Sequence, residues 1–95
     1  MTRKTVPFTQ EGIENLPDNK PALYKILDED GENIYTGTAK RGRVQARIEE
    51  HLPGNKDAIP GTKVVVQQAA SIAEAQDTEK RVIKRSQPKF NVQHK

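Results

Sequence analysis

Short runs of apolar and β-branched residues between turn signals predict three short β-strands along the chain. Residues 22–27 and residues 33–37 are the first two, and residues 63–69, with three consecutive valines, are the third. The segment between the first two contains Asp30-Gly31, a pair that tolerates the positive φ of a tight turn. The first two strands are therefore predicted to form a β-hairpin.

A two-residue loop at Asp30-Gly31 would fix how the strands of this hairpin pair. Ile26 would then lie opposite Tyr35, and Tyr24 opposite Gly37. Because successive side chains point to opposite faces of a strand, both tyrosines would share one face of the hairpin. A slip of one residue would separate them, so their proximity depends on this register.

The periodicity becomes helical in residues 43–52. Its apolar positions recur at helical spacing: Val44, Ile48 and Leu52. Arg47 and His51 are four residues apart along one edge of this stripe, and Pro53-Gly54 ends the helix. We therefore expect the arginine and the histidine to lie on the same side of the helix.

A second helix is predicted from Ser71 to about Arg85, ended by Pro88. Ser71 is its expected N-cap, with Glu74 completing a capping box. The apolar side of this helix consists of Ile72, Ala75, Val82 and Ile83. Glu79 breaks the pattern, because its angular position lies inside that apolar side.

Three residues of these helices each have two open interpretations. A carboxylate in an apolar stripe costs free energy unless it is paired. Glu79 therefore either forms a buried salt bridge with an arginine, or acts as a metal ligand or an acid–base group. Arg47 either extends into solvent along the apolar surface or presents its planar fork to a phosphate oxygen. His51 is either an ordinary rim residue or a proton acceptor.

The element order β-β-α-β-α predicts an α+β fold: a small three-stranded antiparallel sheet flanked by helices. Residues 1–20 are polar and are predicted to be a lead-in with one short helical turn around Thr9 to Leu16. A single domain is predicted over residues 21–92, followed by a tail at residues 93–95.

Composition excludes several classes of function. The chain has 95 residues and no cysteine, which excludes disulfides, thiolate zinc sites and cysteine nucleophiles. Its two histidines cannot by themselves build a histidine-rich metal site. No apolar run exceeds three residues, which is too short for a transmembrane helix or the core of a signal peptide. We predict a cytoplasmic protein that does not act at a membrane.

Positive charge is concentrated in two segments, although the formal net charge is only +3. Residues 40–48 and residues 80–95 contain several basic residues and no acidic ones. Such clusters suit a polyanion, although two solvated helix faces would give the same pattern. The basic residues expected to bind nucleic acid are Lys40, Arg41, Arg43, Lys84 and Lys89.

Segments in the first half of the chain resemble the GIY-YIG nuclease domain in order and spacing. Pro21-Ala22-Leu23-Tyr24 stands where the family has Gly-Ile-Tyr, and Tyr35-Thr36-Gly37 where it has Tyr-Ile-Gly. Arg47 and His51 match the helical arginine of the family and the Tyr/His position that follows it.

The second half continues the resemblance, which covers residues 17–92. The helix with Glu79 matches the glutamate helix of the family, and Gln87-Pro88-Lys89-Phe90-Asn91 matches its closing Pro-Lys-Tyr-Asn. These two segments look most like the N-terminal nuclease domain of the bacterial excinuclease C proteins. The resemblance identifies the fold as GIY-YIG endonuclease-like.

The resemblance implies hydrolysis of a phosphodiester with one Mg²⁺ or Mn²⁺ ion. Glu79 would be the sole protein ligand of the ion, with water and phosphate oxygens as its other ligands. Arg47 would bind the scissile phosphate and offset its charge in the transition state. Tyr24 or Tyr35 would position or deprotonate the attacking water, with His51 as a helper or a competing base.

The resemblance also assigns residues that shape the site, and the chain departs from the family at a few positions. Gly37 would let the backbone approach closely, and Asn91 would hold the site by hydrogen bonds. Ala22-Leu23 replaces Gly-Ile, Thr38 stands where lysine is frequent, and Phe90 replaces a tyrosine. Every position expected to be catalytic keeps a compatible residue.

The expected partner is DNA, double-stranded or branched, in a repair or mobile-element context. A separate specificity protein is a further partner to consider, and the sequence leaves the oligomeric state open. Two rivals remain: a non-catalytic nucleic-acid-binding module on the same scaffold, and a small interaction protein with charged faces. A phosphate-binding loop at Gly37 to Val44 is excluded, because it lacks the Lys-Ser/Thr pair.

Overall fold

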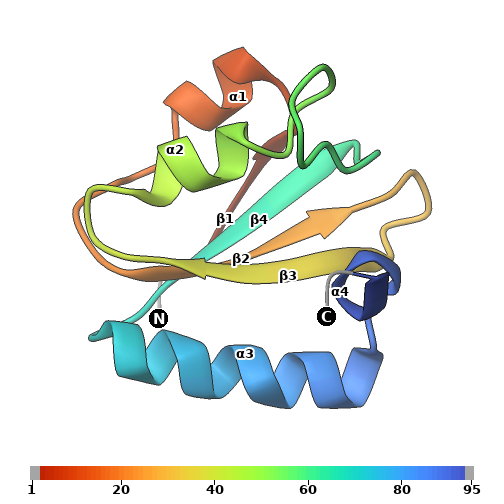
Figure 1. The fold of residues 1–95 in the computed structure, drawn as a ribbon. Coiled ribbons are helices and arrows are strands. Elements are labelled where there is room, and N and C mark those ends of the chain that lie inside the picture. Colours follow the sequence, from red (N-terminus) through yellow and green to blue (C-terminus); the bar gives the residue numbers. More distant parts are fainter. Residues whose placement is uncertain (1–2, 94–95) are drawn as a thin grey trace.

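The computed structural model describes residues 3–93 and contains one antiparallel sheet with helices on both sides (Figure 1). The sheet has the strand order β1-β4-β2-β3. Its strands are β1 (Arg3–Pro7), β2 (Ala22–Leu27), β3 (Asn33–Ala39) and β4 (Lys63–Gln68). The helices are α1 (Gln10–Glu14), α2 (Val44–Glu49), α3 (Ile72–Ser86) and α4 (Lys89–Gln93).

The hydrophobic core lies between the sheet and the pair α1 and α2. In Figure 1 these two helices cover one face of the sheet, while α3 and α4 lie on the other side, next to β3. Side chains of the central strands β2 and β4 fill the core together with apolar residues of α1 and α2. The largest of them are Tyr24, Ile26, Val64, Val66, Ile13, Val44 and Ile48.

The predicted α+β class is confirmed, but the sheet has four strands instead of three. β1 pairs antiparallel with β4, with Val6 opposite Val64. The sequence hides this strand because only one of its residues, Val6, is buried, and β1 is an edge strand. Part of the expected lead-in therefore belongs to the sheet.

The short helix expected within residues 9–16 is present as α1, and Thr9 Oγ1 caps it by accepting from the amide of Gly12 at 3.0 Å. Of the expected tail at residues 93–95, residue 93 ends α4, and residues 94 and 95 lie outside the described part of the chain. None of the helices in residues 3–93 is long and apolar enough to cross a membrane.

The predicted pairing of the hairpin is confirmed, although its loop is longer than expected. Tyr24 lies opposite Gly37 and Ile26 opposite Tyr35, as the sequence predicts. The loop has three residues between Asp28 and Glu32, with Gly31 at φ 81°, and not the two-residue turn at Asp30-Gly31. A bulge between Ile26 and Leu27 shifts the pairing by one residue and restores the predicted register.

The two predicted helices are present, each with slightly different limits. α2 ends at Glu49, so His51 follows the helix in a turn. Ser71 is the N-cap of α3, where its Oγ accepts from the amide of Glu74 at 3.1 Å. The carboxylate of Glu74 accepts from Ala70 instead of Ser71, which still satisfies an amide near the start of the helix.

Candidate active site

Tyr24 and Tyr35 lie on the same face of the hairpin, with their ring centroids 6.1 Å apart. Tyr24 is fully buried, whereas Tyr35 is only partly buried. Gly37 makes this arrangement possible, because a Cβ atom at residue 37 would lie 2.6 Å from Cζ and Oη of Tyr24. The glycine therefore leaves room for the ring of Tyr24, which crosses directly over it.

His51 lies against both tyrosines and forms hydrogen bonds through both ring nitrogens. Its Nε2 is 3.1 Å from the hydroxyl of Tyr24, and its Nδ1 is 2.9 Å from the carbonyl oxygen of Asp57. A carbonyl oxygen only accepts, so Nδ1 carries a proton, and in the neutral ring Nε2 accepts from Tyr24. His51 is 7% exposed, which makes it a buried partner of Tyr24 and not a solvated rim residue.

The loop after α2 returns to His51 and holds the carbonyl group of Asp57 in place. The amide of Ile59 donates to the carbonyl oxygen of His51 at 2.9 Å, and the side chain of Ile59 is buried in the core. Sequence reasoning missed this contact, because a main-chain carbonyl has no signature in the sequence.

Arg47 approaches the tyrosines from α2 with an exposed side chain. Its charge lowers the pKa of Tyr24, of Tyr35 and of Glu79, which places the guanidinium near all three groups. The start of α2 is fixed by Asp18, whose Oδ1 accepts from the amide of Val44 at 2.7 Å. Sequence reasoning did not assign a role to Asp18, which lies 26 residues before the helix that it caps.

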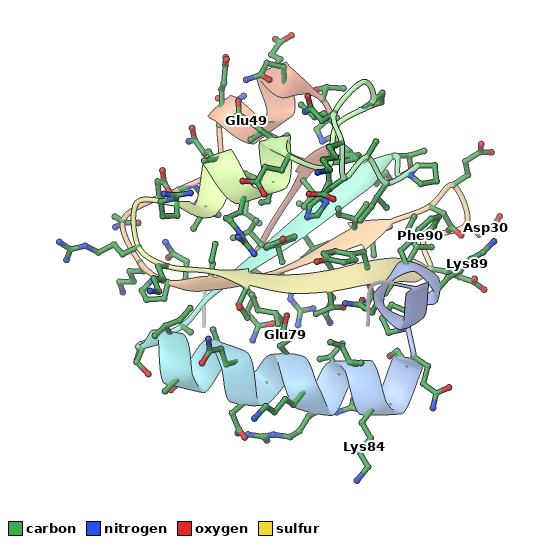
Figure 2. The ribbon with its side chains drawn as sticks, viewed as in Figure 1. Asp30, Glu49, Glu79, Lys84, Lys89 and Phe90 are labelled. Atoms are coloured by element: carbon green, nitrogen blue, oxygen red, sulfur yellow. The ribbon has the colours of Figure 1, made fainter. Side chains whose placement is uncertain are left out.

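Glu79 extends from α3 toward the sheet, as its place in the apolar stripe predicted (Figure 2). Desolvation raises the pKa of its carboxyl above the ordinary value, and the charges of Arg47 and Lys80 partly oppose this shift. Among the described residues the carboxylate forms no ion pair and no hydrogen bond. Residues 3–93 thus do not contain the buried salt bridge that was the alternative interpretation of Glu79.

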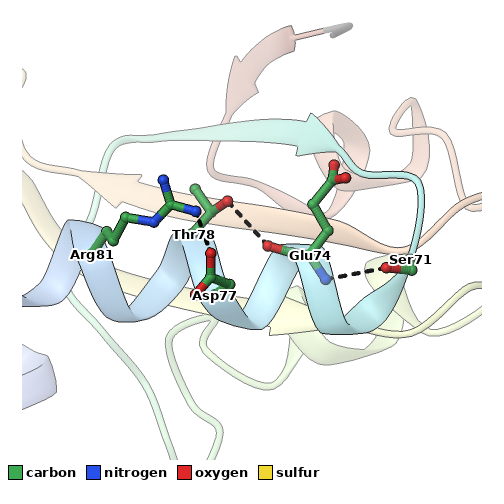
Figure 3. A network of polar contacts seen from close by, with 5 residues as sticks. All are labelled: Ser71, Glu74, Asp77, Thr78 and Arg81. Carbon is green, nitrogen blue, oxygen red and sulfur yellow. Dashed lines mark hydrogen bonds and ion pairs between the residues drawn. The ribbon is translucent and has the colours of Figure 1, made fainter.

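The solvent side of α3 contains the polar contacts that stabilise the helix (Figure 3). Ser71 caps the first turn, the hydroxyl of Thr78 donates to the carbonyl of Glu74 at 3.0 Å, and Arg81 pairs with Asp77. None of these contacts involves Glu79. The helix can therefore hold the Glu79 carboxylate rigidly, because the contacts that stabilise the helix do not involve this group.

Burial raises the pKa of both tyrosine hydroxyls above their ordinary value of 10.0. For Tyr24 desolvation is the largest cause, followed by the adjacent Tyr35. For Tyr35 desolvation and the charge of Glu79 raise the pKa, while Arg47 and a hydrogen bond with Tyr24 lower it. Positive charge close to Tyr35 therefore favours its phenolate form.

The predicted phosphate contacts separate into two groups. Lys40 and Arg43 line a groove of about 330 Å³ together with Arg47 and with Gln76 of α3, while Arg41 is exposed in the same turn. Lys84 points away from the sheet on the outer side of α3, and Lys89 lies at the start of α4 (Figure 2). The structure therefore brings the first basic cluster to the site, but not Lys84.

Asn91 reaches the site from α4 through two hydrogen bonds to the backbone of Thr36. Thr36 is the residue after Tyr35 on β3, the strand at this edge of the sheet. The amide side chain therefore holds the part of β3 from which Tyr35 projects.

No protein-family model matches the chain. Two solved structures of the GIY-YIG N-terminal endonuclease domain of UvrC from Thermotoga maritima align with it at a TM-score of 0.65. One is a point mutant bound to its catalytic divalent cation, 25% identical, and the alignment covers 85% of this chain and 91% of that domain. The chain has a GIY-YIG fold. The second structure, 24% identical, is bound to magnesium.

Curated relatives of this GIY-YIG domain are UvrABC system C proteins. The chain is 33% identical over 90 residues to the protein from Carboxydothermus hydrogenoformans, which covers 86% of this chain and 14% of that protein. It is 36% identical over 84 residues to the protein from Idiomarina loihiensis, and this alignment covers 78% of this chain and 13% of that protein. The predicted resemblance is confirmed, and the chain spans only a small part of the length of these relatives.

Proposed function

We propose that this chain is a metal-dependent endonuclease that hydrolyses phosphodiester bonds in DNA. The proposal depends on one observation: a glutamate, an arginine, a histidine and two tyrosines converge beside the edge strand of a GIY-YIG fold. Residues 21–92 supply all five side chains. The alternative, a non-catalytic nucleic-acid-binding module, gives no role to a desolvated carboxylate without an ion pair.

Glu79 is suited to hold one Mg²⁺ or Mn²⁺ ion. Its carboxylate is partly desolvated and has no ion-pair partner among residues 3–93, and the same part of the chain contains no cluster of three metal-ligating side chains. Mg²⁺ commonly binds through one or two carboxylates and keeps water and phosphate oxygens as its other ligands, so one glutamate is sufficient. The bound ion supplies stabilisation of the leaving oxygen and of the charge that develops on the phosphate.

Arg47 is placed to bind the scissile phosphate. Its guanidinium is exposed at the groove and lies close enough to both Tyr35 and Glu79 to affect their pKa values. A phosphate in contact with Arg47 would therefore lie beside the metal ligand and beside the tyrosine. The planar fork can make two parallel hydrogen bonds to phosphate oxygens, which orients the phosphorus for attack.

Tyr35 is the better candidate for the group that contacts the attacking water. Tyr24 is fully buried, so water and phosphate reach Tyr35 first. The phenol of Tyr35 must lose its proton before it can act as a base. The charge of Arg47 favours that loss, because it lowers the pKa of the phenol.

Tyr24 and His51 provide a route for that proton. In this route Tyr35 would donate to Tyr24, with which it shares a hydrogen bond. Tyr24 would donate to Nε2 of His51, and Nδ1 of His51 donates to the carbonyl of Asp57. When the proton reaches His51, the first two hydrogen bonds reverse direction and the heavy atoms remain in place. The result is a Tyr35 phenolate and a His51 imidazolium, with Tyr24 unchanged.

The biological setting follows from the relatives. We infer DNA repair, because the UvrABC system C proteins share this domain with the chain. Double-stranded or branched DNA is the expected substrate, and a separate protein is expected to supply specificity. The described residues that line the groove include cations but no aromatic side chain that would stack on bases.

Nicking of supercoiled plasmid with Mg²⁺ or Mn²⁺ tests the proposed function. Glu79→Gln should reduce nicking by at least about 10²-fold, because it removes the only metal ligand while DNA binding persists. Glu74→Gln on the exposed side of the same helix is the matched control and should nick like the wild type. If the wild type binds DNA and never nicks it, the binding-module alternative is supported; nicking that survives Glu79→Gln refutes the assignment of the site.

A further inference from the structure

The face of the sheet opposite Tyr24 is only partly covered by helices. On β2 the residues next to Tyr24 are Leu23 and Lys25, whose side chains point to this second face. A hollow of about 310 Å³ lies there, lined by residues of β1, β2, β4 and the start of β3. Cross-strand pairing places Gln67 of β4 between Arg3 and Leu23, and Val65 beside Lys25.

The charged residues that line this hollow are both basic, Arg3 and Lys25, and Arg85 of α3 lies close by. Desolvation lowers the pKa of Lys25, and so do the positive charges of Arg3 and Arg85. Three cations thus repel each other at one place, and among the described residues no carboxylate lines the hollow. An anion bound there would relieve this repulsion.

This face also accounts for part of the second basic segment, residues 80–95, whose basic residues do not line the groove beside Arg47. Arg85 is exposed on the C-terminal half of α3, and it continues the positive charge of the hollow beyond the sheet. The cations therefore extend from β1 across β2 to α3. A ligand with regularly repeated negative charge fits this spread better than a single small anion does.

We propose that this hollow binds the phosphate backbone of a nucleic-acid strand through Arg3, Lys25 and Arg85. The guanidinium of Arg3 is held across the strands by its hydrogen bond to Oε1 of Gln67 at 3.3 Å, which uses one of its five N–H donors. The rest of the lining is aliphatic, amide or hydroxyl, with Leu23, Asn33 and Thr5 among its residues, and no described residue that lines it is aromatic. The site contacts the backbone and not the bases, because base stacking requires aromatic rings.

The position of the hollow indicates the shape of the ligand. The hollow lies on the opposite face of the sheet from the tyrosines, so a straight duplex in the groove beside Arg47 does not reach it. A second arm of branched DNA, or a strand that bends around α3, reaches the hollow. The choice of DNA as ligand rests on the proposed function, whereas binding in the hollow requires no cleavage.

The test is binding of fluorescein-labelled Y-shaped DNA without divalent metal, followed by fluorescence anisotropy at several salt concentrations. The double variant Lys25→Gln/Arg85→Gln should bind more weakly, and the slope of log K against log salt should fall by about 0.9 for each lost phosphate contact. The control Lys20→Gln/Lys56→Gln loses the same charge from exposed positions elsewhere and should keep the wild-type slope.

A second measurement needs no substitution. The pKa of the Lys25 amine, followed by NMR in the wild type, should rise when the Y-shaped DNA is added, because phosphate favours the charged amine. The proposal is refuted if the pKa of Lys25 does not change, or if the salt slope falls by the same amount in both double variants. It is also refuted if polyglutamate displaces the DNA at equal charge concentration, which would indicate an acidic protein as the ligand. Plasmid nicking tests the proposed function separately, so each can fail alone.

Discussion

The side chain of Asn91 pairs with Thr36 as a neighbouring β-strand would. Its Nδ2 donates to the carbonyl oxygen of Thr36 at 2.8 Å, and its Oδ1 accepts from the amide of Thr36 at 2.7 Å. β3 is an edge strand, so no other strand satisfies these groups. A single amide side chain thereby fixes the edge of the sheet at the residue next to Tyr35.

Asn91→Asp should destabilise the protein and slow cleavage. Aspartate loses the donor and places a charged oxygen against the carbonyl of Thr36, so we expect a loss of about 1–3 kcal/mol in the free energy of unfolding. Urea denaturation measures it, and kcat for nicking should fall more than DNA affinity does. Asn55→Asp is the control, because Asn55 donates to the carbonyl of Glu49 from an exposed loop and should cost less. Equal losses would contradict a special role for Asn91.

The proton route predicts that Tyr24 and His51 act as a unit. Tyr24→Phe and His51→Gln should each reduce single-turnover cleavage by about 10²–10⁴-fold, because each blocks transfer of the proton from Tyr35. The cleavage rate of the double variant should be little lower than that of either single variant, because each substitution alone already prevents the proton transfer. Cleavage losses that multiply in the double variant would show independent roles, and DNA binding should stay unchanged throughout.

Gly37→Ala should displace the ring of Tyr24 and reduce both stability and cleavage. The new Cβ would lie 2.6 Å from Cζ of a ring that is fully buried, so the ring or the strand must move. We expect a loss of about 1–3 kcal/mol on thermal or urea unfolding, as for other overpacked cores. Thr38→Ala, the next residue on β3, serves as the control for a small change on the same strand. An unaltered stability of Gly37→Ala would mean that the space for Tyr24 is not restricted.

Glu79 should make the metal-free protein less stable at neutral pH than the variant Glu79→Gln. The folded state raises the pKa of this carboxyl, so its contribution is fully present below the ordinary value of 4.5 and is lost as the pH rises through the folded value. Glu79→Gln should therefore be the more stable protein at pH 7, by no more than about 1 kcal/mol because solvent screens the half-exposed group, and equally stable near pH 4.

Urea denaturation at the two pH values checks this expectation for Glu79, with Glu29→Gln in the exposed hairpin loop as control. Added Mg²⁺ should stabilise the wild type and leave Glu79→Gln unchanged, which reverses their order, because only the wild type retains the ligand. A wild type that is the more stable protein at pH 7 without metal would contradict a desolvated Glu79.

The central part of the fold was predictable because its signals are local. Short apolar and β-branched runs bounded by turn signals identified β2, β3 and β4, and the pairing of Tyr24 with Gly37 followed from the position of the turn. The loop itself was wrong by one residue, and a bulge that no residue pattern announces restored the register. β1 was missed because an edge strand with one buried residue lacks the apolar run that identifies the others.

The candidate site was predictable where a residue violated a pattern. Glu79 stood out because a carboxylate occupied an apolar position, and Arg47 and His51 stood out by their spacing. Asp18 and the carbonyl of Asp57 were not predictable, since each acts through a contact with the backbone or from a distant part of the chain. The direction of Lys84 was missed because a cluster of charges in the sequence does not tell which side of a helix faces the groove.

The partner that orients His51 is a main-chain oxygen. The loop after α2 is therefore tolerant of side-chain substitution at residue 57 but intolerant of a change in its length. Any residue at position 57 offers the same carbonyl, so Asp57 can vary freely in its exposed side chain. Removal of one residue between Pro53 and Ile59 would instead pull the carbonyl away from Nδ1 and unseat the buried Ile59. Variation in this loop is therefore constrained in length and path, and its composition is constrained at Gly54, where φ is 92°, and at the buried Ile59.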